Sequence, residues 1–370
     1  MTCDALVVLN VGSSSVKAQV FEAADSLESR AQGSIAGLGA RPRLAWGENA
    51  TERLEDDVNQ ADAVRKLMQL ACERHQGWVV RAVGHRIVHG GETYRAPVVL
   101  TAKVRADLEA LNALAPLHQA GSLAAAQVVA AMHPEVLQIG CFDTAFHASC
   151  DRLFQVYALP KHLRDQGIRR YGFHGLSYEW IARVLQVDRP ELAEGRVVVA
   201  HLGNGASLCA MRGGRSVDTT MGMTTLDGLP MGTRCGSIDP GIVLYMLRQL
   251  GLSADEIERI LCNESGLAGL SGISHDVRDL LASASPEAAF AIRFYALMAA
   301  QGVARMATSL GGLDAVVFTG GVGEHAAAVR QMILEYLDWM KPFEVLVVAA
   351  NEEQMIAEHC WAMMKAQVKT

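Results

Sequence analysis

A strand, a glycine turn and a second strand occur twice in this chain, and this repetition restricts the fold more than any other feature. In the first copy the apolar run Ala5-Leu-Val-Val-Leu-Asn10 meets a small polar turn, and apolar and polar residues then alternate over residues 16–20. This pattern predicts a β-hairpin. The second copy spans residues 197–211 and has its turn at residues 201–207. Two related hairpins indicate two related domains that present their glycine turns to a shared cleft.

The rest of the chain predicts an α/β architecture in two domains. A length of 370 residues exceeds one ordinary core. Apolar strands at residues 79–83, 136–142, 315–319 and 345–350 alternate with helical stretches. Ser253 begins a capping box, and Ser285 precedes a proline at the start of a helix that runs to Gly311. We expect one domain over residues 1–155 and a second over residues 156–350.

Composition and charge narrow the class of protein. A formal net charge of -7 disfavours a nucleic-acid surface, and the apolar runs are too short to cross a membrane. Asp4 stands where a secretory signal would be positive, so we expect a cytoplasmic protein. The 8 cysteines form no C-x-x-C pair, which indicates reduced core thiols without disulfides or zinc.

Three segments of the first half offer polar groups for catalysis. Asn10-Val-Gly-Ser-Ser-Ser-Val-Lys17 has backbone amides, hydroxyls and an ammonium that suit phosphate oxygens, although a solvated hairpin tip is the simpler interpretation. Arg86 lies between glycines, where its guanidinium could bind an anion or remain a surface arginine. Asp143 ends an apolar strand, which is costly unless it is paired or near a metal, and a helix cap is the alternative.

The second half contributes a matching set. Arg169-Arg-Tyr-Gly-Phe-His-Gly175 concentrates charge and precedes a helix that Ser177 could cap. His174 could donate to a phosphoryl oxygen or be a buried histidine bonded to a backbone carbonyl. Asn204 in the second glycine turn suits a phosphate, and Arg234 follows in another glycine-flanked loop.

Taken in order, these segments resemble the acetate kinase family of short-chain acyl kinases, within the actin, sugar kinase and Hsp70 superfamily. The resemblance spans nearly the whole chain. It is carried by LNVGSSSVK, GHRIVHGGE, APLHQ, FDTAFH, RRYGFHG, HLGNGAS, DTTMGMT, MGTRCGSIDP, ESGLAGLSGIS, FTGGVGE and NEEQMIA. It implies two duplicated actin-like, ribonuclease H-like domains with a cleft between them, and a C-terminal helix at about residues 352–368 that joins the first domain.

The resemblance also implies a reaction. ATP, with Mg2+ or Mn2+, would donate its γ-phosphoryl group directly and reversibly to acetate, which yields acetyl phosphate. The enzyme would be a cytoplasmic homodimer. A carboxylic acid is already ionised at neutral pH, so the acceptor needs no general base, and catalysis must come from cationic groups and positioning.

The roles implied by the resemblance fall on four groups of residues. The catalytic group is Arg86, Asp143, His174 and Arg234. The substrate group is Arg86, Val88, Leu117 and Phe173. The nucleotide group is Lys17, His201, Leu202, Gly203, Asn204, Gly205, Asp276, Val277, Arg278, Gly320, Gly321, Val322, Gly323 and Glu324. The metal group is Asn10 and Glu352, and Ser13 and Ser15 belong to the same phosphate and metal end.

Several positions depart from the family pattern, and other functions stay open. Val277 and His325 replace a usual phenylalanine and asparagine at the nucleotide, Thr225 a proline near the acyl pocket, and Ser237 an aspartate. The segment between residues 324 and 351 is roughly twenty residues short. Propionate and butyrate remain alternative acceptors. A hydroxyl-directed kinase with Asp143 as base, or a non-catalytic ATPase switch, is a more remote alternative.

Overall fold

The chain forms two compact units. The structure is a computed structural model that describes residues 3–12, 14–24, 26–47, 51–73, 78–115 and 119–368. The first unit comprises Met1–Ala145 and Asn351–Thr370, and the second comprises Phe146–Ala350. The boundary between the two units thus follows Ala145, earlier in the chain than the boundary at residue 155 that the sequence suggested.

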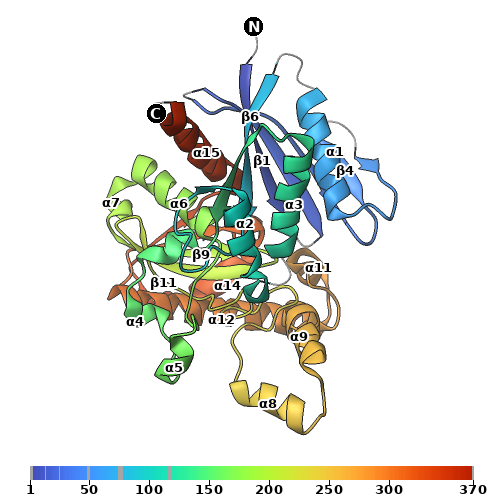
Figure 1. Cartoon of the computed structure of the whole chain (residues 1–370). Helices are drawn as coiled ribbons and strands as arrows, with labels where there is room; N and C mark the ends of the chain where they lie inside the picture. The colour runs from blue at the N-terminus through green and yellow to red at the C-terminus, as the bar shows by residue number, and fades with distance from the viewer. Residues whose placement is uncertain are drawn as a thin grey trace. The chain divides into compact units, whose positions relative to one another are not determined.

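The first unit contains one sheet, three long helices and several short elements (Figure 1). Its elements are β1 (Cys3–Val11), β2 (Ser15–Glu22), β3 (Ser29–Ala36), β4 (Arg43–Trp46), β5 (Glu52–Arg53), α1 (Gln60–Glu73), β6 (Trp78–Ile87), β7 (Val98–Val99), α2 (Ala102–Glu109), η1 (Asn112–Leu114), α3 (Gln119–Met132), β8 (Leu137–Phe142) and α15 (Glu352–Val368).

The second unit contains a smaller sheet and most of the helices. It begins within η2 (Ala145–Ser149). Its other elements are α4 (Arg152–Gln155), α5 (Lys161–Arg164), α6 (Gly175–Asp188), α7 (Pro190–Ala193), β9 (Arg196–Leu202), β10 (Ala206–Arg212), β11 (Arg215–Thr219), α8 (Pro240–Arg248), α9 (Ala254–Asn263), α10 (Gly266–Ser271), α11 (Val277–Ala282), α12 (Pro286–Leu310), β12 (Ala315–Thr319), α13 (Gly320–His325), α14 (Ala327–Tyr336), η3 (Asp338–Met340) and β13 (Glu344–Val347).

The two sheets share one five-strand arrangement. The first has the order β5-β4-β3-β2-β1-β6-β8-β7, and the second has the order β11-β10-β9-β12-β13. In each, three antiparallel strands (β3-β2-β1 or β11-β10-β9) continue into two parallel strands (β6-β8 or β12-β13). The duplication predicted from the glycine turns is thus present in the strand topology, and the α/β class is confirmed.

Helices cover both faces of the first sheet (Figure 1). On one face, side chains of α1 and α3 pack on inward-facing residues of β1 and β2, such as Val7 and Val16. On the other face, Ile356 and Cys360 of α15 lie against β6, where a Cβ on Gly84 would come within 2.6 Å of both side chains. A glycine at this position therefore lets α15 approach the sheet, which places the start of α15 beside the end of β1.

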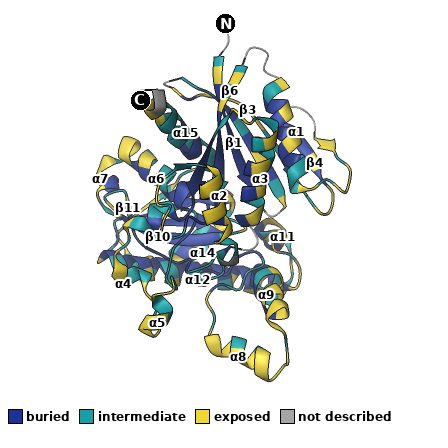
Figure 2. Ribbon diagram, in the orientation of Figure 1, coloured by how far each residue is buried: buried dark blue, intermediate teal, exposed yellow. Residues whose placement is uncertain are grey.

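The second sheet has a similar apolar core. Tyr178 and Ile181 of α6 pack on Val197 and Val199 of β9, and the long helix α12 lies along the opposite side. Figure 2 shows the central strands and the inner sides of these helices as buried. The ends of β9 and β10 therefore stand on a rigid base.

Several local predictions are confirmed. Ser253 forms a capping box with Glu256, and Ser285 caps α12, which ends before Gly311 in the left-handed conformation. All eight cysteines are free thiols, but only Cys141, Cys209 and Cys360 are buried, so the prediction of core thiols holds for a minority. Among the described residues, no helix is long and apolar enough to span a membrane.

Candidate active site

Arg86 in the first unit is bound to a buried carboxylate. It lies on β6 next to β8, and Asp143 follows the end of β8. The Nε and Nη2 atoms of Arg86 donate to the two oxygens of Asp143 over 3.0 and 2.7 Å, while the Asp143 side chain is only 2% exposed. A bidentate ion pair with Arg86 thus offsets the free-energy cost of burying the Asp143 carboxylate at the end of the strand.

The end of β1 and the start of α15 complete this charged cluster. Arg86 Nη1 donates to Asn10 Oδ1 over 3.3 Å and lies 3.3 Å from Glu352 Oε2. The amide of Asn10 donates in turn to Glu353 Oε1 over 3.0 Å and to Glu352 Oε2 over 3.4 Å. Residues far apart in sequence thereby surround one guanidinium.

Electrostatics keeps Arg86 charged. Burial alone would lower its pKa, but the nearby carboxylates of Asp143 and Glu352 raise the pKa well above its ordinary value. Three carboxylates and one guanidinium leave the cluster with an excess of negative charge. A second cation would therefore be attracted to it.

The donor set of this cluster suits a hard divalent cation. It consists of carboxylate and amide oxygens from Asn10, Asp143, Glu352 and Glu353. Mg2+ is usually held by one or two carboxylates, with water and substrate phosphates as the other ligands. The described part of the chain holds no ready cage of three or more His, Cys, Asp or Glu side chains. The residues present thus fit a cation that binds together with a phosphate.

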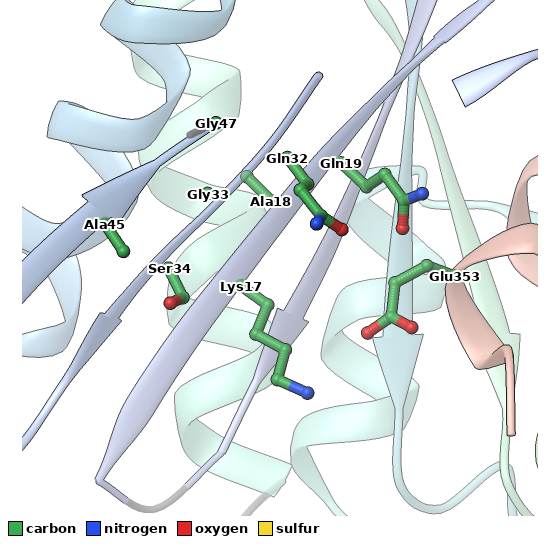
Figure 3. A pocket seen from close by; sticks show the side chains of 9 residues that line it. All are labelled: Lys17, Ala18, Gln19, Gln32, Gly33, Ser34, Ala45, Gly47 and Glu353. Carbon is green, nitrogen blue, oxygen red and sulfur yellow. The ribbon is translucent and has the colours of Figure 1, made fainter. Parts of the chain in front are cut away.

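A pocket of about 290 Å³ lies on the same sheet near Glu353. Lys17 and Gln19 of β2, Gln32 and Ser34 of β3, and Glu353 of α15 line it (Figure 3). Lys17 pairs with Asn10 across β1 and β2, so both side chains project from the same face of the hairpin. An ammonium thus stands beside the charged cluster, while Ser13 lies outside the described residues.

His174 in the second unit occupies a special backbone position. It precedes α6 with φ 58°, in the left-handed region that non-glycine residues rarely adopt. The carbonyl of the preceding Phe173 accepts a 2.9 Å hydrogen bond from His147 Nε2. The prediction that Ser177 caps this helix is wrong: His174 is the N-cap residue, and the Ser177 hydroxyl is hydrogen-bonded to His201 Nδ1 at 2.9 Å.

Neutral polar groups surround the His174 ring. Its Nδ1 lies 2.8 Å from Ser207 Oγ, and Ser207 Oγ lies 2.5 Å from the hydroxyl of Tyr178. The ring stacks on His201 with centroids 4.3 Å apart. His201 and Ser207 are paired across β9 and β10, so the second hairpin carries both. This neutral cluster of His174, Ser177, Tyr178, His201 and Ser207 is the counterpart of the charged cluster.

Arg234 and His174 converge above the second glycine turn. A Cβ on Gly205 would lie 3.3 Å from His174 Nε2 and 4.0 Å from Arg234 Nη2. The Arg234 guanidinium also donates to the carbonyl of Thr225 over 3.0 Å, and Gly232 N donates to Asn204 O over 3.1 Å, which joins the two loops. His174 Nε2 and the Arg234 guanidinium therefore face the space that the missing side chain of Gly205 leaves open.

A second pocket, of about 300 Å³, begins at the same turn. Seven of the expected nucleotide residues line it together with His275 and His325. These seven are Gly203, Asn204, Asp276, Val277, Arg278, Gly321 and Val322. Asp276 caps α11 by accepting from Arg278 N, which fixes one wall. The pocket is mainly apolar and suits the flat face of a base.

Of the other expected nucleotide residues, Leu202, Gly320, Gly323 and Glu324 support the walls of this pocket, whereas Lys17 lines the pocket of the first unit. Leu202 is fully buried, and its carbonyl would lie 2.8 Å from a Cβ on Gly320, so a side chain there would clash. Glu324 accepts hydrogen bonds from Gly320 N and Ala350 N over 2.9 and 3.0 Å. Gly323 is buried in α13. These residues shape the turn and do not line the pocket.

The residues expected to bind the acyl group are only partly described. Val88 and Phe173 are 5% and 1% exposed, and Leu117 lies outside the described residues. Thr225 contributes its backbone carbonyl to Arg234. Ser237, in place of the usual aspartate, donates to Asp227 Oδ1 over 2.5 Å.

Comparisons with known proteins agree on one family. The sequence profile of the acetokinase family matches residues 5–343. An acetate kinase of Rhodopseudomonas palustris strain TIE-1 is 43% identical over 401 residues, which cover 97% of this chain and 98% of that protein. The chain therefore belongs to the acetokinase family.

Solved structures give the same result. The crystal structure of Porphyromonas gingivalis acetate kinase has a TM-score of 0.85 and 32% identity, and the match covers 98% of this chain and 100% of that one. A propionate kinase from Francisella tularensis has a TM-score of 0.88 and 34% identity, with 97% and 99% covered. The fold is shared with both proteins.

The sequence did not single out some residues of the two clusters and the pockets. Glu353 lies directly after Glu352, which was the residue chosen in that motif, and His275 belongs to no motif of its own. Tyr178 lies four residues after His174, and its amide donates to the His174 carbonyl over 3.1 Å at the start of α6. Ser207 ends the second glycine motif, but its role appears only with the contact to His174.

Proposed function

We propose that this acetokinase-family protein transfers the γ-phosphoryl group of ATP directly and reversibly to a short-chain carboxylate, foremost acetate, and so forms an acyl phosphate. The convergence of His174 Nε2 and Arg234 above Gly205, beside a pocket that suits a base, is the observation that carries this proposal. The names of the relatives support acetate as acceptor, and the likeness to a propionate kinase makes propionate the main alternative.

The second unit would hold the nucleotide. Its base would lie in the pocket lined by Val277 and Val322, and its phosphates would extend over residues 203–205. His174 and Arg234 would then donate to oxygens of the transferred group, whose negative charge is redistributed in the transition state. Donors fixed in advance need no rearrangement, which lowers the barrier.

The charged cluster would serve the metal and the acceptor. Asn10 and Glu352 would hold Mg2+, helped by Asp143, and Lys17 would face the phosphates. When bound, the metal supplies positive charge that neutralises the phosphate oxygens. Arg86 orients these carboxylates and would offer its guanidinium to the acceptor carboxylate, near Val88, which follows β6.

The contacts of Asp143 argue against a hydroxyl-directed kinase. Such an enzyme needs a base to accept the hydroxyl proton, and Asp143 is the candidate for this base. Both of its oxygens accept hydrogen bonds from Arg86. A carboxylate held in this way is a poor base, whereas a carboxylate acceptor requires none.

Trapping the product as a hydroxamate tests the proposal. The protein is incubated with ATP, Mg2+, hydroxylamine and acetate, propionate, butyrate or glycerol. We expect a hydroxamate signal with acetate, a weaker signal as the acid becomes longer, and none with glycerol. In the reverse direction, we expect the protein to form ATP from ADP and acetyl phosphate. Absence of signal with every carboxylate would refute the proposal, while a stronger signal with propionate would change the preferred acceptor.

We also propose a homodimer in the cytoplasm. Helix α8 has no buried residue, and Leu244 and Tyr245 are 48% and 57% exposed (Figure 2). Exposed apolar helices of this kind commonly mark an interface. The free cysteines suit a reducing compartment. Light scattering of the wild type and of Tyr245→Lys would test the assembly, since the variant should shift toward monomer.

A further inference from the structure

We propose that Tyr178 and Ser207 form a hydroxyl relay that fixes His174 in the tautomer with its proton on Nε2. Tyr178 is then a positioning residue for phosphoryl transfer. The tautomer follows from hydrogen bonds within the second unit alone. Its consequence for catalysis rests on the proposed function.

The relay begins at the Tyr178 hydroxyl. This side chain is fully buried, and among the described residues its hydrogen-bond partner is Ser207 Oγ at 2.5 Å. A buried hydroxyl proton without an acceptor loses the hydrogen bond that it makes to water in the unfolded chain, which disfavours folding. Burial also raises the pKa of Tyr178 well above its ordinary value, so the group keeps its proton. The Tyr178 hydroxyl therefore donates to Ser207.

Ser207 in turn donates its hydrogen bond to His174. Its hydroxyl is completely buried and has two polar neighbours in the described part of the chain, Tyr178 and His174 Nδ1 at 2.8 Å. Because it accepts from Tyr178, its single proton points to Nδ1. A neutral imidazole whose Nδ1 accepts carries its proton on Nε2.

The opposite direction leaves a buried donor without an acceptor. If His174 Nδ1 carried the proton, it would donate to Ser207, and Ser207 would donate to Tyr178. The proton of Tyr178 would then have no acceptor among the described residues. The energy of one buried hydroxyl therefore selects the tautomer of a histidine two hydrogen bonds away.

The rest of the cluster fixes the ring orientation. The ring of His174 stacks on His201, and the Ser177 hydroxyl binds His201 Nδ1 from the first turn of α6. The Nε2 atom then lies 3.3 Å from a Cβ position on Gly205, on the side of Arg234. It presents a donor to an anion there and no lone pair, so His174 stabilises charge and does not act as a nucleophile through Nε2.

Nitrogen NMR of the protein labelled with 15N-histidine tests the relay. The signals of His174 are identified by their loss in His174→Gln. We expect Nε2 of the wild type to be protonated and Nδ1 to be unprotonated at pH 7.5. In Tyr178→Phe the direction of the relay is no longer imposed, and the two nitrogen signals should move toward each other as the tautomers exchange. Ser177→Ala is the matched control, because it removes the equivalent bond to His201 and should leave both His174 signals in place.

A protonated Nδ1 in the wild type overturns the proposal, as do unchanged His174 signals in folded Tyr178→Phe. If the variant fails to fold, the wild-type spectrum alone decides. In the kinase assay we expect Tyr178→Phe to lower kcat roughly 2- to 10-fold, the equivalent of one neutral hydrogen bond, with an unchanged KM for ATP. The expected tautomer in a protein without kinase activity would refute the proposed function and support the relay.

Discussion

The charged cluster of the first unit and the neutral cluster of the second unit are built on equivalent hairpins but are held together in different ways. Around Arg86, the bonds join a guanidinium to carboxylates and to the amide of Asn10. Around His174, they join hydroxyls and imidazoles. The first arrangement depends on charge balance, and the second depends on the direction of hydrogen bonds. Duplicated folds can therefore carry different chemistry at matching strand ends.

Removal of Arg86 should have the largest effect. Asp143 is 2% exposed in the wild type, and Arg86→Ala removes its ion pair with Arg86, which should cost roughly 3 kcal/mol of folding stability, because breaking a buried ion pair leaves a charge behind. Acyl phosphate formation should fall by several orders of magnitude. Urea unfolding and the hydroxamate assay measure the two losses separately.

The double variant Arg86→Ala/Asp143→Asn separates charge balance from catalysis. It should recover much of the stability, since the buried charge of Asp143 is removed together with that of Arg86, but it should not recover the activity. Recovery of both would show that Arg86 only supports the fold, and a single variant as stable as the wild type would contradict the charge-balance account.

A methyl group on Gly205 should block the space that the neutral cluster faces. Gly205→Ala places a carbon 3.3 Å from His174 Nε2 and 4.0 Å from Arg234 Nη2. Displacement of the transferred group by about 1 Å can cost roughly 100-fold in kcat. The melting temperature should change little.

Gly321→Ala is the comparison for this variant. A Cβ there meets no atom within 4 Å, and Gly321 lines the pocket that we propose for the nucleotide. Steady-state kinetics should show mainly a raised KM for ATP. Equal kcat values for Gly205→Ala and the wild type would place the phosphoryl group elsewhere.

Acid should destabilise both units through buried histidines. Burial lowers the pKa of His85, His89 and His147 to about 4, below the value of about 6.5 for an unfolded histidine. The unfolded chain then binds protons first, so stability is complete above pH 6.5 and is lost as the pH falls toward 4.

Urea midpoints at pH 7, 6 and 5 should show this loss, and His85→Gln should make the decline shallower. A midpoint independent of pH would contradict the assignment.

A helix cap that belongs to neither cluster should give the smallest effect, and it serves as the baseline for the other variants. Ser253→Ala removes the capping box of α9 and should cost about 1 kcal/mol of stability. Activity should be unchanged at a temperature where the variant is folded. A loss of kcat in this variant would show that activity reports general stability, and the effects at Arg86 and Gly205 would then need reinterpretation.

Local sequence patterns predicted the helices, strands and turns more reliably than they predicted the side-chain contacts. The two hairpins and the caps at Ser253 and Ser285 follow from hydrophobic period and neighbouring residues, and all are present. Ser177 was assigned as a cap by the same reasoning, but its hydroxyl binds His201, which comes close only when α6 packs on β9. The strand expected at residues 345–350 is instead Glu344–Val347. Side-chain partners from another element can override a local preference.

The sequence by itself determined two glycine turns, an α/β fold and the residue types of a phosphotransferase site, because strand periods and turn residues are local properties. The tertiary structure decided which groups meet. Asp143 is 57 positions from Arg86, and Glu352 is 342 positions from Asn10. It also set the direction of the hydrogen bonds from Tyr178 through Ser207 to His174, because that direction depends on which buried hydroxyl lacks another acceptor.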